Sequence, residues 1–209
     1  MTETAEYDRE TLVGVLETSR SWGFLGPGDV EAHIDHAIGY VDLIPSNSRV
    51  LDLGSGGGVP GLVLAVTRRD CRFTLLDTNV RRCTFLRTAM EDLELTTRVD
   101  VAEGRAEDLA RDPHLRHSFD VVVARSFGAP AVLAECAVGF LNQSGSIVVS
   151  EPPERSANRW DVDGLATLGL EPGRMVVREH SSLQQLKAVS LCSEKYPRRN
   201  GVPSRKPLF

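Results

Sequence analysis

Residues 49–61, with the sequence RVLDLGSGGGVPG, constrain the fold of this chain more than any other stretch. A short apolar run ends in a cluster with five glycines among residues 54–61, and a second apolar run follows. This order predicts a strand, a tight loop and the start of a helix. Glycine permits positive φ angles and lets backbone amides approach a ligand closely, and the amino end of a helix favours anionic groups. Because a plain turn does not need so many glycines, we predict a nucleotide-binding loop.

Two kinds of nucleotide site fit this loop. Residues 56–61 satisfy the G-x-G-x-x-G pattern of dinucleotide-binding folds, which is a weak signal by itself. Asp52 and the alternating glycines after it form instead an acidic-G-x-G-x-G signature that resembles class I methyltransferases dependent on S-adenosylmethionine (SAM). A carboxylate beside the loop attracts the cationic sulfonium of SAM, whereas it would repel a pyrophosphate. We therefore expect SAM as the cofactor and not NAD, held by Asp52, Gly54, Ser55, Gly56 and Gly58.

The composition is that of an ordinary globular protein of 209 residues, with 41% hydrophobic and 25% charged residues. No run is long and apolar enough to span a membrane, and residues 1–6 lack the basic and apolar regions of a secretory signal. We expect a cytoplasmic protein without a membrane partner. The formal net charge of −5 argues against contact with nucleic acid over the whole surface, so any RNA contact must be local.

Metal chemistry is not expected. The four cysteines are far apart in the sequence and form no C-x-x-C pair, so we interpret them as core thiols. His33 and His36 are neighbours on a predicted helix over residues 29–42, but no third ligand lies in a suitable register. We interpret this pair as the flank of a helix near the cofactor site.

The order of the predicted elements is typical of a doubly wound α/β fold. Two helices, over residues 8–21 and 29–42, form an extension (residues 1–45) packed on a domain of residues 46–209 that includes a basic tail. In that domain strands and helices alternate, and antiparallel strands close the sheet. The strands are predicted at residues 50–53, 71–76, 99–102, 119–124 and 146–150, the helices at 60–69, 80–93 and 129–140, and the closing strands at 175–177 and 182–192.

Asp77 and Arg125 each follow a predicted strand, where open α/β sheets bind their ligands. Asp77 lies 23 residues beyond Gly54, the distance at which an acidic residue accepts hydrogen bonds from ribose hydroxyls. Capping of the next helix is the alternative role, which Thr78 or Asn79 could fill equally well. For Arg125 the choice lies between substrate contact and a salt bridge to a neighbouring carboxylate.

Several motifs together resemble one family, the bacterial small-subunit rRNA guanine-N7 methyltransferases (RsmG, also called GidB). These motifs are residues 51–61, 74–77, 81–86, 104–107 and 124–126 and the tail 196–208. The resemblance implies a class I, Rossmann-like fold with a mostly parallel seven-stranded sheet and helices on both faces. It also implies that SAM is the cofactor and that ribosomal RNA or the small ribosomal subunit is the partner. A loop with Ala106 and Glu107 would contact the adenine, although Glu107 or Asp108 could equally be a carboxylate of a helix first turn.

The chain departs from the family at two points. No Asn-Leu-Thr segment precedes His33, and the usual Lys-Gly pair is replaced by the sequence SEPP at residues 150–153. The exchange of a cation for Glu151 predicts a weaker RNA contact there. Four tail cations, Arg198, Arg199, Arg205 and Lys206, are predicted to hold phosphates; the alternative is that the proline-rich tail is a structural strap along the sheet edge.

Methyl transfer to guanine N7 requires alignment more than proton transfer, because this nitrogen has a free lone pair. We therefore expect no general base, and we assign Arg125 to positioning the substrate. Three functions fit the sequence: methylation of guanine N7 in 16S rRNA, methylation of a small molecule or another target, and non-catalytic SAM binding. The family resemblance and the tail cations support the first, which is our prediction. The acidic net charge and the missing Lys favour the second, which is the alternative.

Overall fold

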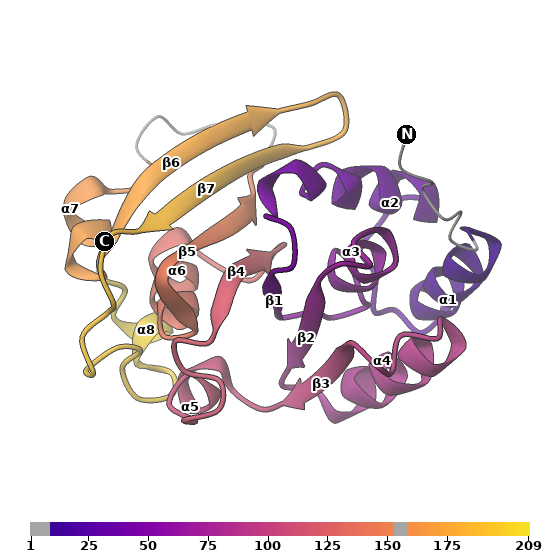
Figure 1. Ribbon diagram of the computed structural model, residues 1–209, viewed down its shortest axis with the longest axis horizontal. Helices are drawn as coiled ribbons and strands as arrows, with labels where there is room; N and C mark the ends of the chain where they lie inside the picture. The colour runs from indigo at the N-terminus through magenta and orange to yellow at the C-terminus, as the bar shows by residue number, and fades with distance from the viewer. Residues whose placement is uncertain (1–8, 153–158) are drawn as a thin grey trace.

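The computed structural model describes residues 9–152 and 159–209, and its seven strands form one sheet in the order β3-β2-β1-β4-β5-β7-β6 (Figure 1). Neighbours among β1 to β5 pair in parallel, and β7 pairs antiparallel with both β5 and β6. The predicted Rossmann-like, mostly parallel seven-stranded fold is confirmed. The strands are β1 (Arg49–Leu53), β2 (Arg72–Asp77), β3 (Val99–Glu103), β4 (Phe119–Ala124), β5 (Leu141–Ser150), β6 (Leu170–Val177) and β7 (Ser182–Ala188).

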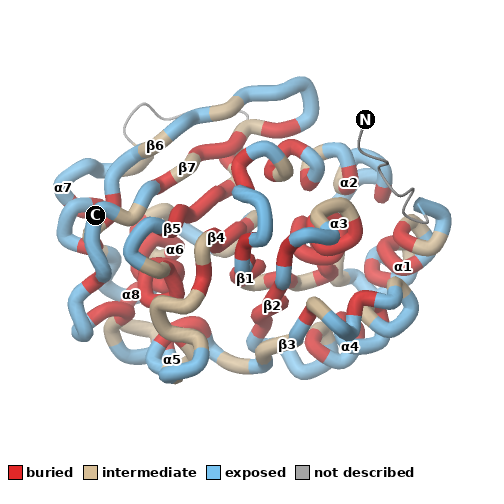
Figure 2. Tube along the Cα trace, in the orientation of Figure 1, coloured by how far each residue is buried: buried red, intermediate tan, exposed pale blue. Residues whose placement is uncertain are grey.

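Helices cover both faces of the sheet because successive strand residues point to opposite sides. Val50 belongs to a cluster with α1 to α4, whereas Leu51 belongs to a second cluster with α5, α6 and α7. Figure 2 shows the buried residues concentrated in the central strands and in α3. The helices are α1 (Arg9–Ser21), α2 (Val30–Ile38), the 3-10 helix η1 (Val41–Leu43), α3 (Gly61–Thr67), α4 (Val80–Asp92), α5 (Ala106–Leu109), α6 (Pro130–Val138), α7 (Val162–Thr167) and α8 (Val202–Arg205).

The amino-terminal helices share a core with the sheet. Leu12 and Leu16 of α1 and Ile34 of α2 are completely buried in the same cluster as Leu62 of α3. Ser19 donates a hydrogen bond of 2.9 Å to the carbonyl of Gly57, in the glycine-rich loop. The extension therefore supports the loop from its outer side.

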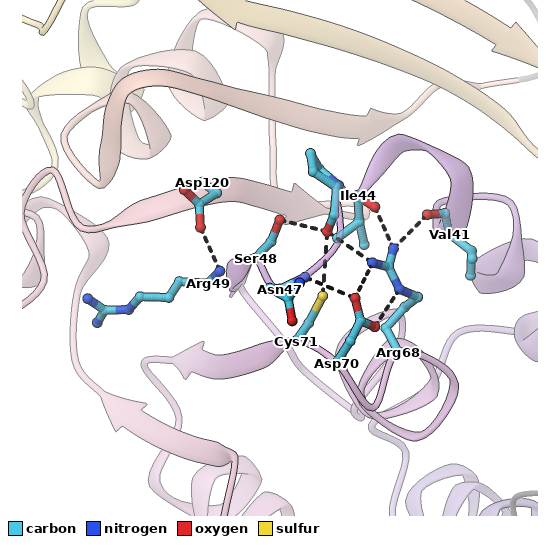
Figure 3. A network of polar contacts seen from close by, with 10 residues as sticks. Val41, Ile44, Asn47, Ser48, Arg49, Arg68, Asp70, Cys71 and Asp120 are labelled. Carbon is cyan, nitrogen blue, oxygen red and sulfur yellow. Dashed lines mark hydrogen bonds and ion pairs between the residues drawn. The ribbon is translucent and has the colours of Figure 1, made fainter. Parts of the chain in front are cut away.

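Arg68 joins the end of α3 to the segment that leads into β1 (Figure 3). Its guanidinium donates to the carbonyls of Val41, Ile44 and Pro45 and to both carboxylate oxygens of Asp70. Asp70 also accepts the backbone N–H of Asn47 at 2.9 Å. This network fixes the edge of the sheet at which the parallel strands begin.

The structure corrects several predicted boundaries. Helix α2 ends at Ile38, well before residue 42, and a Cβ at Gly39 would lie 2.1 Å from Ser181 Oγ. This close contact leaves no room for a side chain at position 39, and the glycine favours the end of the helix. Strand β5 begins at Leu141 and β6 at Leu170, both earlier than predicted, and β7 ends at Ala188. The short helices α5, α7 and α8 were not predicted, since four to six residues carry too little periodicity.

Candidate active site

The glycine-rich loop between β1 and α3 depends on backbone conformations that favour glycine. Gly54, Gly56 and Gly58 have φ angles of +74°, +54° and +93°. A Cβ at Gly54 would lie 2.8 Å from the ring of Phe127, and one at Gly58 would lie 2.4 Å from Leu62. Positions 54 and 58 therefore have no room for a side chain. A nucleotide-binding loop needs such a bare backbone.

Asp52 lies behind this loop and is completely buried. Its Oδ2 accepts the backbone N–H of Gly61 at 3.0 Å, and its Oδ1 has no hydrogen-bond partner among the residues that the structure describes. Burial raises the pKa of Asp52 to about 7. Asp52 does not line the smaller of the two cavities at the ends of the strands, and its contact with the cofactor stays a prediction. Its carboxylate holds the start of α3.

Asp77, at the end of β2, holds the other side of the loop. Its Oδ2 accepts the N–H of Gly56 at 2.9 Å, and its Oδ1 accepts the N–H of Asn79 at 2.8 Å. The cap of α4 is Asn79, whose side chain accepts the backbone N–H groups of Arg81 and Arg82. Capping of α4, which was the alternative role for Asp77, is therefore performed by Asn79.

A cavity of about 290 Å³ brings four of the predicted cofactor residues together: Gly54, Asp77, Ala106 and Glu107. Ser55 and Gly56 lie next to this wall in the loop, and the hydroxyl of Ser55 donates to the carbonyl of Asp52 at 2.9 Å. An acidic side chain, a backbone cradle and an apolar ring from Phe127 are the groups that an adenosyl moiety needs. The cavity thus fits SAM.

A second cavity, of about 640 Å³, lies beside the first. Ser126 and Phe127, which follow β4, line both cavities. Ser126 has a φ angle of +56°, a conformation that residues other than glycine rarely adopt and that is common at functional sites. The two cavities therefore meet at the carboxyl end of β4.

Arg125 lies between this junction and helix α2. Its guanidinium donates to Nδ1 of His33 at 3.1 Å, and His33 Nε2 donates to the carbonyl of Gly26 at 3.2 Å. No ion pair between described residues involves Arg125, so the alternative of a salt bridge is not supported. Burial is the main cause that lowers its pKa. Arg125 lines neither cavity directly.

His36 and Tyr40 continue this polar cluster along the chain. His36 Nε2 lies 3.1 Å from Ser150 Oγ at the end of β5, and within residues 9–152 and 159–209 its buried Nδ1 finds no partner. Burial, followed by the charges of Arg125 and His33, lowers the pKa of His36 to about 4. The imidazole is therefore neutral near pH 7. Tyr40 is completely buried, and its hydroxyl donates to the carbonyl of Ala124 at 3.0 Å.

Glu151 does not present a free charge to the second cavity. Its carboxylate accepts a 2.7 Å hydrogen bond from the indole of Trp160 and forms an ion pair of 2.9 Å with Arg159. Only 3% of its side chain is exposed. The carboxylate of Glu151 is therefore compensated within the protein, while the family's cation is still missing, so the weaker RNA contact stays a prediction.

In the carboxyl-terminal tail, Arg198 has a partner inside the protein. Its Nε and one terminal nitrogen donate to the two carboxylate oxygens of Glu135 at 2.8 and 2.6 Å, and Glu135 is completely buried. This pairing favours a structural role for Arg198 over the predicted binding of phosphate. The side chains of Arg199, Arg205 and Lys206 are exposed. The tail packs on α5 and α6, and not along the sheet edge.

The described residues give no sign of a metal centre or a membrane segment. None of their clusters combines three histidine, cysteine, aspartate or glutamate side chains in a way that could hold a metal ion. No helix in the described ranges is long and apolar enough to cross a bilayer. His33 and His36 contact Arg125 and Ser150, as expected for residues that flank the site.

Sequence reasoning missed several residues of the site. Ser126, Phe127 and Ser150 could have been nominated from their positions, because each follows or ends a parallel strand at its carboxyl edge. Tyr40 and Ser204 carry no such signal, since both reach the site only through packing of segments far apart in the chain.

The sequence matches a family model described as rRNA small subunit methyltransferase G over residues 29–155. Ribosomal RNA small subunit methyltransferase G from Deinococcus deserti is 34% identical over 175 residues, covering 79% of this chain and 70% of that protein. The protein of the same name from Parasynechococcus marenigrum is 35% identical over 172 residues, covering 78% and 69%.

Solved structures support the same fold at low sequence identity. An O-methyltransferase from Bacillus cereus in complex with SAH has a TM-score of 0.59 at 16% identity, covering 88% of this chain and 91% of that one. Cofactor-bound Rv0187 from MTB has a TM-score of 0.60 at 18% identity, covering 90% and 93%. The cradle, the acidic residue after β2 and these similarities agree: the chain belongs to the rRNA small subunit methyltransferase G family, and it is a SAM-dependent methyltransferase.

Proposed function

We propose that this protein transfers the methyl group of SAM to guanine N7 in 16S ribosomal RNA. The observation that carries the proposal is the junction of the two cavities at Ser126 and Phe127. One cavity has the residues expected to hold SAM, and the larger one is open enough to admit a base. The names of the relatives support the substrate class. An enzyme with this substrate would act in the cytoplasm.

The chemistry at the junction agrees with attack by a neutral nitrogen. Bound SAM supplies an electrophilic methyl group on a sulfonium. Guanine N7 attacks through its lone pair, so no proton has to leave first, and alignment of the two reacting atoms supplies most of the catalysis. The base becomes positively charged as it is methylated, and a neutral His36 adds no opposing charge.

The hydrogen-bonding groups at the open cavity suit the exposed edge of a guanine. This edge presents the acceptors N7 and O6. The Ser150 hydroxyl and the His36 imidazole lie together at the end of β5, and His36 also lines the cavity. We propose that they orient the base through O6, while Arg125 positions α2 through its hydrogen bond with His33.

The remaining tail cations are a separate proposal. If Arg199, Arg205 and Lys206 bind phosphates, replacing all three by alanine should weaken RNA binding and flatten its salt dependence. The slope should fall by roughly 0.7 for each phosphate of a single strand that the variant no longer neutralises. Filter binding across a salt series measures this slope. Equal slopes for the variant and the wild type would exclude the tail from RNA binding.

Methylation of RNA that lacks the modification tests the function. Small ribosomal subunits from a strain without this gene are incubated with the protein and labelled SAM, and nucleosides are analysed by mass spectrometry. We expect 7-methylguanosine in 16S rRNA. A protein that binds SAM but labels no RNA would favour a small-molecule methyltransferase, for which the net charge of −5 is the supporting observation, or a non-catalytic SAM-binding protein.

A further inference from the structure

The carboxyl-terminal tail contributes to the cofactor cavity. Ser204, in the short helix α8, lines the same cavity as Asp77 and Glu107. Figure 1 shows α8 beside α5 and α6, although more than 60 residues separate α8 from α6 in the sequence. We call residues 196–206 the strap. Its course brings a hydroxyl from the end of the chain to a site otherwise built from residues before 140.

The first anchor of the strap is the buried carboxylate of Glu135 on α6. Besides the two bonds from its guanidinium, Arg198 donates its backbone N–H to Glu135 at 2.8 Å. A buried carboxylate is strongly destabilising unless it is paired and hydrogen bonded. One terminal nitrogen of Arg198 also donates to the carbonyl of Lys206 at 2.7 Å. Arg198 thus closes residues 198–206 into a loop and fixes that loop to α6.

The second anchor lies in the wall of the cavity itself. The backbone N–H of Gly201 donates to Oε1 of Glu107 at 3.0 Å, and Gly201 has a φ angle of +74°. Glu107 is 7% exposed and lies in the first turn of α5. Because the strap holds this carboxylate from behind, it determines how the residue lies toward the cavity.

Further contacts hold the start of the strap. Arg116 donates to the carbonyl of Tyr196 at 3.1 Å, and Arg111 donates to the carbonyl of Pro197. Pro203, next to Ser204, is buried, whereas Ser204 is exposed. The strap is therefore fixed on its inner side while Ser204 stays accessible from the cavity.

We propose that the strap forms a wall of the SAM cavity at the adenine end, with Ser204 in contact with the adenosyl group and the Glu135–Arg198 pair as the device that positions it. The ligand class is the adenosyl group shared by SAM and SAH. The inference does not depend on the identity of the methyl acceptor. It assigns Arg198 to positioning the strap and not to RNA, because Glu135 neutralises the charge of this arginine.

Replacement of Ser204 by tryptophan tests the wall directly. The larger side chain should occupy part of the cavity and raise the dissociation constant for SAH at least ~10-fold, measured by calorimetry. Ser193→Trp is the matched control, because Ser193 is also an exposed serine, lies shortly before the strap and does not line the cavity. Unchanged SAH binding in a folded Ser204→Trp protein would overturn the proposal, whether or not RNA is the substrate.

Replacement of Arg198 tests the positioning device. Arg198→Ala should raise the KM for SAM about 10-fold with little change in the KM for RNA, and Arg198→Lys should restore part of the affinity. The control is Arg174→Ala, because Arg174 is an exposed arginine of β6 that lines neither cavity. If Arg198→Ala does not fold, the SAH affinity of Ser204→Trp still decides the question. A rise confined to the KM for RNA would show that Arg198 serves the acceptor and would contradict the proposal.

Discussion

Two aspartates at opposite edges of the sheet have opposite environments. Asp70, where β2 begins, has both carboxylate oxygens bonded to Arg68 and accepts the N–H of Asn47 (Figure 3). These bonds, above all those from Arg68, hold its pKa well below its usual range. Asp52, near the end of β1, is completely buried with one oxygen unpaired, and its pKa is raised to about 7.

The paired environment of Asp70 contributes to stability, whereas the unpaired environment of Asp52 belongs to the ligand-binding edge. At the edge where the strands begin, Arg68 and Asp70 pair with each other and join the amino-terminal segment to the core. At the edge where the strands end, one buried atom of Asp52 and one of His36 have no partner among the described residues, and His36 lines the larger cavity. Unpaired buried polar atoms are destabilising, and they are common where a site is arranged for a ligand.

The largest effect is expected from Arg125→Ala at the ligand edge. Without the hydrogen bond to His33, α2 and the residues that align the base should shift, and a misplacement of about 1 Å can lower the rate ~100-fold. We expect a fall in kcat of this size with SAH affinity nearly unchanged. Arg72→Ala, an exposed arginine at the opposite end of β2, is the control. Methyl transfer to RNA measures the rate; an Arg125→Ala protein with normal kcat would remove Arg125 from the site.

Arg68→Ala tests the other edge. It removes five hydrogen bonds, three of them to carbonyls of the segment before β1. Since a net hydrogen bond contributes ~1 kcal/mol and part of this network is exposed, the free energy of unfolding should fall by about 2 to 3 kcal/mol. Urea denaturation measures this, with the neighbouring Arg69→Ala as control. SAH affinity should not change; a large fall in affinity would mean that the two edges are coupled.

Asp77→Ala should lower SAM affinity at least ~10-fold, because hydrogen bonds to a charged acceptor contribute roughly 1.5 to 3 kcal/mol each. Asp70→Ala is the matched control from the stable edge, and it should lower stability without changing affinity. Calorimetry with SAM measures both. Equal affinities of Asp77→Ala and the wild type would mean that Asp77 does not bind the cofactor and serves only through its hydrogen bonds to Gly56 and Asn79.

The last comparison concerns pH. The pKa of Asp52 is about 7 in the folded protein and about 3.9 in the unfolded chain, so the folded state binds more protons between these values. Its contribution to the free energy of unfolding therefore falls as the pH rises from about 4 to about 7 and is constant above that. Asp70 acts in the opposite sense, because its pKa is lowered. Its contribution to the free energy of unfolding is lost as the pH falls below about 4.

Asp52→Asn keeps an acceptor for Gly61 and removes the titration. Denaturation of the wild type and this variant at about pH 4.5, 6 and 7.5 isolates the contribution of Asp52. The difference in the free energy of unfolding should change by a few kcal/mol across this range, and it should change in favour of the variant as the pH rises. A difference that is the same at all three pH values would show that Asp52 does not titrate there.

The cradle and the acidic residue after β2 could be predicted because their signals are local. The loop needs positive φ angles at positions 54, 56 and 58, and these favour glycine. In a parallel sheet the carboxyl ends of the strands lie together at one edge. Asp77 therefore lines the cavity as expected. Asp52 does not, since the direction of its side chain depends on the N–H of Gly61 beyond the loop.

The order of strands and helices, the glycine loop and the family can be read from the residues alone, because period and spacing are properties of neighbouring residues. The partners of the charged side chains become visible only in the folded protein. Arg198 had the same appearance in the sequence as Arg199, yet it pairs with Glu135, 63 residues away. Glu151 looked like an unfavourable charge, but Arg159 and Trp160 compensate it. Partners of charged side chains are chosen by packing, and packing joins segments that no local pattern connects.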